Sequence, residues 1–328
     1  MPLTCLLSDS FFSTPEFIYE ALNIMSIIGA PIHIFGTYVI IFKSPNNLSS
    51  IKWPMLNLQF WSSTLDFLIS VLVTPVALFP SIAGYSMGVL YKLGVPDFIQ
   101  MHLMITFIGL VLLSILTVYE NQYFLLSIKS GSWAHWRTSF LIGYYILMST
   151  FLIPFTATIP NQDHAVDEVF QRLWCLQGIL DKSRVFVYTL RFSAAFFACG
   201  FLYTTTILLT LGFIILTLRI LLNNKNTGTT YSKKTLKLQK KFLTGLIIQT
   251  SVPVIVMIFP LCYLVWTVYF GLYYQAYNNF TMLVLSSHGL LSKIAMLVVH
   301  EPYRKAAVTC FVTCSRRPES RVSDTLKI

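Results

Sequence analysis

The sequence predicts an all-α membrane protein whose single domain, residues 1–328, is a bundle of seven transmembrane helices. Hydrophobic residues make up 55% of the chain and charged residues only 11%, with a mean hydropathy of +0.68. A soluble domain carries about 25% charged residues, so this chain has too few charges to cover a water-exposed surface. Several apolar runs also exceed the roughly 18–20 residues that a helix needs to cross the bilayer core.

Seven apolar segments have this length. Lipid offers the backbone no hydrogen-bond partner, so each segment is expected to satisfy its own N–H and C=O groups as a helix. In chain order the expected spans are residues 21–42, 54–80, 98–119, 138–158, 192–218, 242–268 and 280–299. Residues 1–20 then precede the helix bundle of 21–299, and residues 300–328 form a tail.

Basic residues are distributed unequally between the two sets of segments that connect these spans. One set holds 17 Lys and Arg residues and the other holds 5, while Lys293 lies inside the seventh span. The positive-inside rule places the richer set in the cytoplasm, so the N-terminus is expected outside and the tail inside. The net charge of +10 is then explained by cytoplasmic loops that meet anionic lipid, and not by a nucleic-acid partner.

Cys5 and Cys175 both fall outside under this topology, where the compartment is oxidising. A Cys5–Cys175 disulfide is expected to tie the N-terminal segment to the long connection between the fourth and fifth spans. Closing so large a loop stabilises by a few kcal/mol in the chain-entropy model. The alternative is two unpaired thiols.

The tail begins with EPYRKAAVTCFVTC, which has the spacing of a short interfacial helix. Pro302 suits a first helical turn, and Ala307, Cys310, Phe311 and Cys314 fall on one face. Cys310 and Cys314 are therefore candidates for palmitoylation. The alternative is that both are ordinary small apolar residues.

Ionisable residues inside the spans are costly in lipid and therefore mark candidate functional positions. Asp66 in the second span and His288 in the seventh lie at a similar depth, about 18–20 Å from the cytoplasmic ends of their helices. With Asn57 and Ser287 they are expected to form a polar network, which either changes on activation or is static. Lys293 either snorkels to the membrane surface or, less simply, pairs with Asp66.

The third span ends on VYENQYFLL, in which an acid, two amides and a tyrosine follow an apolar run: Glu120, Asn121, Gln122 and Tyr123. The start of the sixth span offers only basic charge, at Lys237, Lys240 and Lys241. One hypothesis is that Glu120 holds the sixth span through one of these lysines. An exposed pair of this kind contributes no more than about 1 kcal/mol, and a partly buried pair contributes more.

Aromatic side chains at the outer ends of the spans are expected to form an interfacial belt or to line a ligand cavity. The candidate ligand-pocket residues are His102, Tyr203, Tyr263 and Trp266. No P-loop, nucleophile elbow, paired carboxylates or metal-ligand cluster is found, so neither catalysis nor a cofactor is expected. A transporter or ligand-gated channel is the alternative class, but no internal repeat or ring of charge supports it.

Several segments of the chain, taken in order, form a recognisable set: STPEF, PIHIFGTYVIIFKSP, IKWPMLNLQFWSSTLDFLIS, VTPVALFPSIAGYSMGVL, ENQY, IPNQDHA with the later Cys175, HG at His288, and LVVHEPYR. Together they resemble the class H serpentine chemoreceptors of nematodes. Each piece alone is weak. Their order and spacing over nearly the whole chain make the set specific.

The resemblance implies a rhodopsin-like chemosensory G protein-coupled receptor in the plasma membrane, at the cilia of sensory neurons. Such a receptor binds a small odorant-like ligand in the outer half of the bundle and activates a heterotrimeric G protein α-subunit. The end of the third span and the lysines of the sixth would then face the G protein. The family carries an arginine where this chain has Gln122, and Lys293 also departs from its pattern, which leaves open a divergent or signalling-impaired member.

Overall fold

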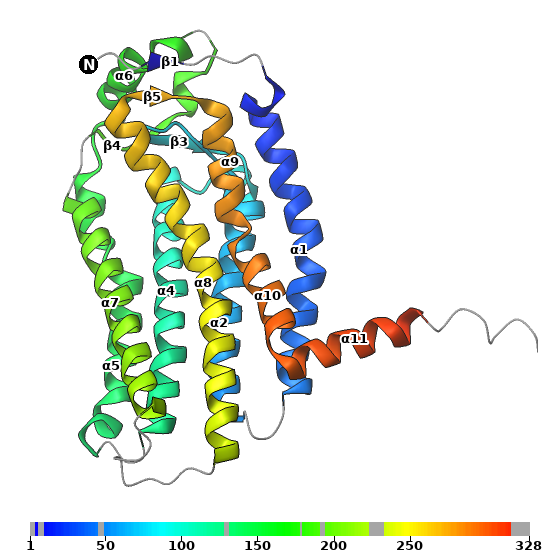
Figure 1. Ribbon diagram of the computed structural model, residues 1–328. Helices are drawn as coiled ribbons and strands as arrows, with labels where there is room; N and C mark the ends of the chain where they lie inside the picture. Colours follow the sequence, from blue (N-terminus) through cyan, green and yellow to red (C-terminus); the bar gives the residue numbers. More distant parts are fainter. Residues whose placement is uncertain are drawn as a thin grey trace, which may run out of the picture.

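The computed structural model describes residues 4–5, 10–44, 49–127, 131–177, 179–190, 194–222 and 233–315. Long helices run side by side, short strands close one end of the bundle, and helix α11 leaves it at the other end (Figure 1). We call these the sheet end and the tail end of the bundle.

The helices of the bundle are α1 (Pro15–Lys43), α2 (Ser49–Phe67), α4 (Asp97–Leu126), α5 (Gly131–Thr150), α7 (Ala194–Leu222), α8 (Lys233–Phe270), α9 (Gln275–Ser286) and α10 (His288–Val299). The helices outside the bundle are α3 (Val89–Lys92), α6 (Gln162–Arg172) and α11 (Glu301–Ser315). Among the described helices, six are long and apolar enough to cross a membrane, and the pair α9 and α10, bent by 43°, makes a seventh span. The predicted seven-helix fold class is therefore confirmed.

The second span ends earlier than the predicted boundary at residue 80. After α2 the chain continues as a π-helical segment, η3 (Leu68–Val73), and then Thr74 takes a left-handed conformation with φ 48°. Pro75 explains this ending, because proline has no N–H to donate and disfavours helical geometry in the residue before it. Pro75 instead begins a strand.

Short strands at the sheet end are an addition to the predicted all-α bundle. Strand β3 (Ile82–Ser86) lies between β2 (Pro75–Ala77) and β4 (Phe186–Thr189), and both pairings are antiparallel. Strand β1 (Thr4–Cys5) pairs in parallel with β5 (Leu272–Tyr273). Because β4 belongs to the connection between α5 and α7, the three-stranded sheet fixes that connection over the end of the bundle.

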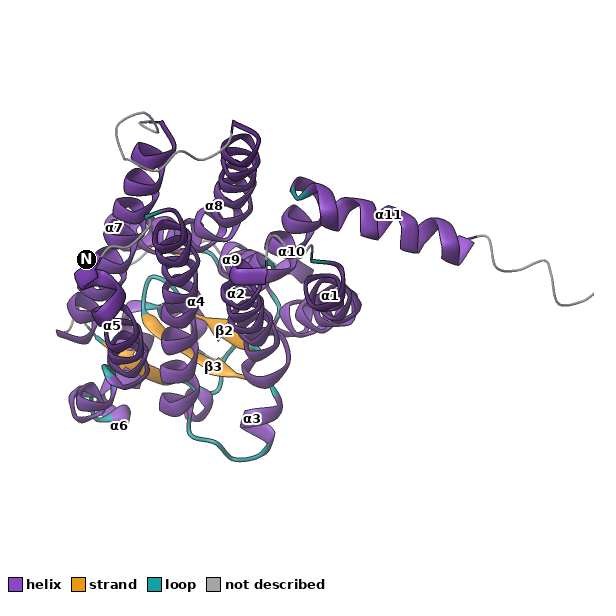
Figure 2. Ribbon diagram, turned by 90° about the horizontal axis from the view of Figure 1, so that it is seen from below, coloured by secondary structure: helices purple, strands orange, loops and turns teal. Residues whose placement is uncertain are grey.

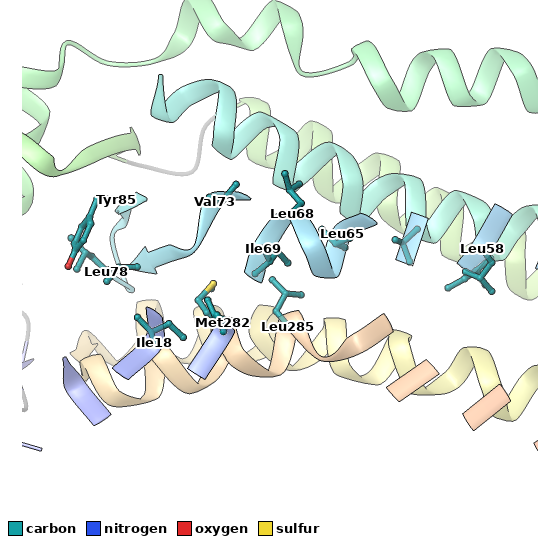
Figure 3. Packing of buried hydrophobic residues seen from close by; sticks show 14 of the residues in the cluster. Ile18, Leu58, Leu65, Leu68, Ile69, Val73, Leu78, Tyr85, Met282 and Leu285 are labelled. Atoms are coloured by element: carbon teal, nitrogen blue, oxygen red, sulfur yellow. The ribbon is translucent and has the colours of Figure 1, made fainter. Parts of the chain in front are cut away.

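The core at this end is formed by apolar side chains of α1, α9 and the α2–η3 span. Figure 3 shows Ile18, Met282 and Leu285 opposite Leu65 and Ile69. All five residues belong to one cluster of buried side chains that continues towards the tail end. This packing brings α1, α2 and α10 close enough for polar groups from the three helices to meet deeper in the bundle.

The helices differ in how much of their apolar surface is covered by protein. Half of the apolar window of α4 is buried, compared with 22% for α1 and 17% for the span that contains α5. Viewed along the bundle, α4 lies between α5 and α2 (Figure 2). A helix that is apolar all round but mostly uncovered, such as α1 with Ile27 at 74% exposure, is suited to contact with lipid.

Candidate functional site

Asp66 of α2 is buried at the start of α10 and accepts hydrogen bonds from two histidines and two backbone amides. Its Oδ1 lies 2.7 Å from His288 Nδ1 and 3.2 Å from the Gly289 amide nitrogen. Its Oδ2 lies 2.8 Å from the Leu290 amide nitrogen and 3.2 Å from His33 Nε2. The carboxylate therefore caps the N-terminus of α10, where unsatisfied N–H groups and the helix dipole favour a negative charge.

Gly289 makes this close approach possible. A Cβ at position 289 would lie 2.5 Å from Asp66 Oδ2 and 2.8 Å from the Ser62 carbonyl oxygen. The bend between α9 and α10 exposes the amides, and the missing side chain lets the carboxylate of α2 reach them. His288 thus supplies an imidazole donor, and Gly289 leaves the space that the Asp66 carboxylate occupies.

Lys293 is fully buried one helical turn further along α10. Its Nζ lies 3.2 Å from the His33 carbonyl oxygen, 3.4 Å from Thr37 Oγ1 and 3.1 Å from Ser63 Oγ. An ammonium group has three donors, and here each has an acceptor. The stem passes over Gly36, where a Cβ would lie 2.5 Å from Lys293 Cδ.

These contacts correct both predictions for Lys293, because it neither snorkels nor contacts Asp66 directly. Ser63 Oγ lies 3.0 Å from His33 Nδ1 as well as 3.1 Å from Lys293 Nζ. Ser63 therefore contacts both Lys293 and His33, and His33 in turn contacts Asp66. We call this chain of four residues the relay; it joins Lys293 to Asp66 through Ser63 and His33.

Two predicted members of the polar network lie outside the relay. Asn57 instead donates to the Tyr145 hydroxyl at 2.6 Å and accepts from Trp61 Nε1 at 3.1 Å. Ser287 donates to the Val284 carbonyl oxygen at 2.7 Å, within its own helix turn. The expected network therefore contains Asp66, His288 and Lys293 but neither Asn57 nor Ser287.

Sequence reasoning missed His33, Thr37 and Ser63 as members of this site. The sequence held a signal for all three. His33 and Thr37 lie one helical turn apart on the first span, and Ser63 lies three residues before Asp66, so each pair shares a helix face. The rotation of each helix about its own axis decides which face looks inward, and the sequence does not fix that rotation.

Glu120 of α4 is also fully buried, and its partners lie on α5. Arg137 donates to both carboxylate oxygens, from Nε to Oε1 at 3.1 Å and from Nη2 to Oε2 at 2.8 Å. Trp133 Nε1 donates to Oε1 at 2.9 Å. The hypothesis that Glu120 holds the sixth span through a lysine is therefore wrong in this structure, because a bidentate guanidinium occupies the carboxylate.

The remaining residues of the ENQY element contact four helices, α2, α5, α7 and α8. Asn121 donates to the Ser50 carbonyl oxygen at 3.1 Å and accepts from Arg137 at 3.2 Å. Gln122 is fully buried and donates from Nε2 to Gln239 Oε1 on α8 at 3.0 Å. Tyr123 is half-buried against the ring of Phe213, with centroids 5.6 Å apart.

Gln122 thus makes a polar contact with α8. We call the Gln122–Gln239 hydrogen bond the amide clasp. A second α4–α8 hydrogen bond joins Tyr119 to Thr250 at 2.6 Å, one turn deeper. Gln122 is buried against α8, whereas Glu120 is buried against α5, so the expectation that both face a G protein stays a prediction.

The lysines at the start of α8 point away from α4. Lys237 and Lys240 are exposed, and Lys241 forms an ion pair of 2.5 Å with Glu301 at the start of α11. Glu301 also pairs with Lys305 at 2.9 Å. The hydrogen bonds from Lys241 and Lys305 lower the pKa of Glu301 to about 2.

The predicted ligand-pocket residues are divided between different helix contacts. His102 lies within 3.3 Å of the Leu152 carbonyl oxygen, and the Tyr203 hydroxyl donates to the Ile105 carbonyl oxygen, so both join α4 to its neighbours. The Tyr263 hydroxyl donates to Asn278 at 2.8 Å, between α8 and α9. Trp266 is 57% exposed, which places it on the outside of α8.

The cysteines follow the predicted division in part. Cys175 is disulfide-bonded and buried, while Cys199, Cys262 and Cys310 are free. The side chains of Cys5 and Cys314 lie outside the described residues, so the Cys5–Cys175 pairing and palmitoylation of the tail stay predictions. Among the residues described, no group of three or more His, Cys, Asp or Glu side chains could hold a metal ion.

Comparison with known proteins identifies the family. The model of the serpentine type 7TM GPCR chemoreceptor family Srh matches residues 13–313. Serpentine receptor class H-72 of Caenorhabditis elegans is 23% identical over 320 residues, which cover 95% of this chain and 90% of that receptor. The resemblance drawn from the sequence is confirmed: the chain belongs to the Srh family of serpentine seven-transmembrane chemoreceptors.

Proposed function

We propose that this chemoreceptor binds a small odorant-like molecule in the outer half of the bundle and activates a heterotrimeric G protein α-subunit. In this proposal the N-terminus lies outside the plasma membrane of a sensory neuron, at its cilia, and the tail end of the bundle faces the cytoplasm. The positive-inside rule supports this orientation, because the basic starts of α8 and α11 share the tail end.

The amide clasp is the observation that carries the proposal. Opening a cytoplasmic cleft requires α8 to separate from α4, and at the tail end a neutral hydrogen bond between two amides joins them. A neutral hydrogen bond contributes about 0.5–1.5 kcal/mol, compared with about 1.5–3 kcal/mol when one partner is charged. The clasp itself therefore adds little to the cost of separating α8 from α4, and a ligand that binds the open arrangement better than the closed one shifts the equilibrium.

The relay holds α1, α2 and α10 together, and these helices form the fixed part of the bundle in this proposal. It links α1, α2 and α10 through buried charges whose donors and acceptors are matched, so these helices stay together while α8 moves. Arg137 and Glu120 likewise hold α5 to α4. On activation, α8 thus moves while the other helices stay in place.

Co-expression of the full chain with a promiscuous Gα tests the proposal. Cells are screened with an odorant library while second messenger and surface receptor are measured together, and cells that lack Gα serve as the control. The expected result is a ligand response that needs Gα. Surface-expressed receptor without a response to any ligand contradicts the proposal, and an ionic current that persists without Gα supports a channel instead.

A further inference from the structure

A cleft of about 360 Å³ lies at the sheet end, outside the relay and the amide clasp. It is an open surface cleft bordered by the first turns of α1, by α3 and by the short helix η6 (Lys182–Arg184), and its lining residues are Glu16, Tyr19, Glu20, Met87, Tyr91, Lys92 and Arg184. This volume falls within the range of about 300–1,000 Å³ that is typical of small-molecule sites. We call it the sheet-end cleft.

The cleft contains two negative and two positive side chains that do not pair with one another. Glu16 and Glu20 lie one helical turn apart on the same face of α1. Lys92 and Arg184 approach from α3 and η6, yet neither is among the described ion pairs. The neighbouring Lys182 does form an ion pair, because its Nζ lies 2.5 Å from Asp167 Oδ1.

Aromatic rings hold the two cations against the walls of the cleft. Lys92 Nζ lies 5.7 Å from the centroid of the Tyr19 ring. Arg184 Cζ lies 5.2 Å from the ring of Tyr85, in strand β3, and 5.9 Å from the ring of Tyr91. Cation–π contact fixes a guanidinium or ammonium group without using its N–H donors, so the donors stay available to a ligand.

We propose that the sheet-end cleft binds a zwitterion that carries a phosphate and an ammonium group. Arg184 and Lys92 contact the phosphate, for which a planar guanidinium offers two parallel N–H donors, and Glu16 and Glu20 contact the ammonium. A simple anion would be repelled by the two carboxylates, and a simple cation by Arg184 and Lys92. A ligand with both charges satisfies both pairs.

Two sources offer this chemistry. One is a free compound of the phosphoethanolamine type in the surrounding fluid. The other is the headgroup of a zwitterionic phospholipid, since the cleft lies where the first span begins. Binding at this site does not depend on the odorant pocket or on G protein coupling.

Thermal unfolding of the purified full chain in an uncharged detergent tests the proposal with O-phosphoethanolamine as the probe. The expected result is a saturable rise in Tm that inorganic phosphate, ethanolamine or their equimolar mixture does not reproduce. Arg184→Gln and Glu20→Gln are each expected to weaken probe binding at least fivefold. Lys182→Gln is the matched control, because it removes a positive charge from the same short helix outside the cleft and is expected to leave binding unchanged.

Receptor in nanodiscs distinguishes the two sources. If lipid is the source, discs of phosphatidylethanolamine prevent the probe from acting, discs of phosphatidylglycerol do not, and native mass spectrometry finds bound phosphatidylethanolamine on wild type but not on Arg184→Gln. If the free compound is the source, the probe acts equally in both discs. The proposal is overturned if the separated phosphate and ethanolamine match the probe, or if Lys182→Gln weakens binding as much as Arg184→Gln.

Discussion

The relay and the amide clasp join helices by opposite means. In the relay, two buried charges are surrounded by matched donors and acceptors from α1, α2 and α10. In the clasp, two uncharged amides share one hydrogen bond between α4 and α8. The two contacts therefore differ in the charge of the groups that they bury and in the free energy that is lost when each contact is broken.

The physical reason lies in what remains after each contact is broken. Separating the relay leaves a charge in a low-dielectric interior, which costs several kcal/mol. Separating the clasp leaves neutral groups at the tail end, where water can reach them once α8 moves, so little of the hydrogen-bond energy is lost. The predictions below test this contrast, from the largest expected effect to the smallest.

Removal of one relay charge should have the largest effect. Lys293→Met leaves Asp66 buried without its balancing charge, and we expect a loss of about 3–5 kcal/mol in the free energy of unfolding. The double variant Lys293→Met/Asp66→Asn should lose less than the two single variants summed, because neither charge remains. Denaturant unfolding in micelles measures this, with the exposed Lys240→Met as control; an equal loss in that control would refute the role given to the relay.

Glu120→Gln should have the next largest effect. The amide cannot accept a bidentate, charge-assisted contact from Arg137, so we expect a loss of about 1.5–3 kcal/mol in the free energy of unfolding. Thermal or denaturant unfolding provides the measurement, and Glu301→Gln, which removes an acid from exposed ion pairs, provides the comparison. If Glu120→Gln is as mild as Glu301→Gln, the buried pair does not hold α5 to α4.

Gly289→Ala tests the close approach of α2 to α10 without removing a charge. The added methyl group collides with Asp66 Oδ2, so the carboxylate must withdraw from the amides of α10, at a cost of about 1–3 kcal/mol. Gly212→Ala in α7 is the matched control, because a Cβ there meets nothing within 4 Å. A loss no larger than that of the control would show that Asp66 does not depend on this gap.

Loss of the amide clasp should change stability little but signalling clearly. Gln122→Ala is expected to cost about 0.5–1.5 kcal/mol and to raise basal, ligand-independent signalling through a promiscuous Gα. Gln239→Ala should act similarly, and the double variant should add nothing further, because both single variants break the same bond. Unchanged basal signalling in both single variants, at equal surface expression, would remove the clasp from the activation step.

The smallest effect concerns the attachment of α11 to α8 by Glu301. The pKa of this carboxyl is lowered from 4.5 to about 2, so its contribution is complete above pH 4.5 and is lost as the pH falls towards 2. A spin label on the exposed Cys310 should therefore report constant mobility of α11 from pH 7 to 5 and higher mobility below pH 4. Glu301→Gln should be mobile throughout; mobility that rises in wild type between pH 7 and 5 would point to another group.

The ionisable residues of the candidate site could be predicted from the sequence, but the residues that contact them could not. Burial cost alone singled out Asp66, His288 and Lys293, because an ionisable residue in an apolar span has few tolerable positions. Asn57 and Ser287 of the same two spans were expected as partners, and both form hydrogen bonds elsewhere. Depth along a helix can be counted from the sequence, whereas the direction in which a side chain points depends on how neighbouring helices pack.

Glu120 illustrates the same limit at the tail end. Its polarity at the end of an apolar run marked it, but its partner was expected among the lysines of the sixth span. In the sequence, Arg137 is one of the 17 Lys and Arg residues in the segments assigned to the cytoplasm, and nothing there marks it as the partner of Glu120. Packing of α5 against α4 brings its guanidinium within 2.8 Å of the carboxylate, and this contact is local to the folded bundle.

The sequence by itself determined the class of this protein, the order of its seven spans and its family, because apolar length and residue order are properties of the chain. The tertiary structure alone decided which polar groups meet: that His33 and Ser63 connect Lys293 to Asp66, that Gln122 contacts Gln239, and that Pro75 begins a strand at the sheet end. These outcomes depend on helix rotation and on the bend at Ser287, which are set by long-range packing and not by local preference.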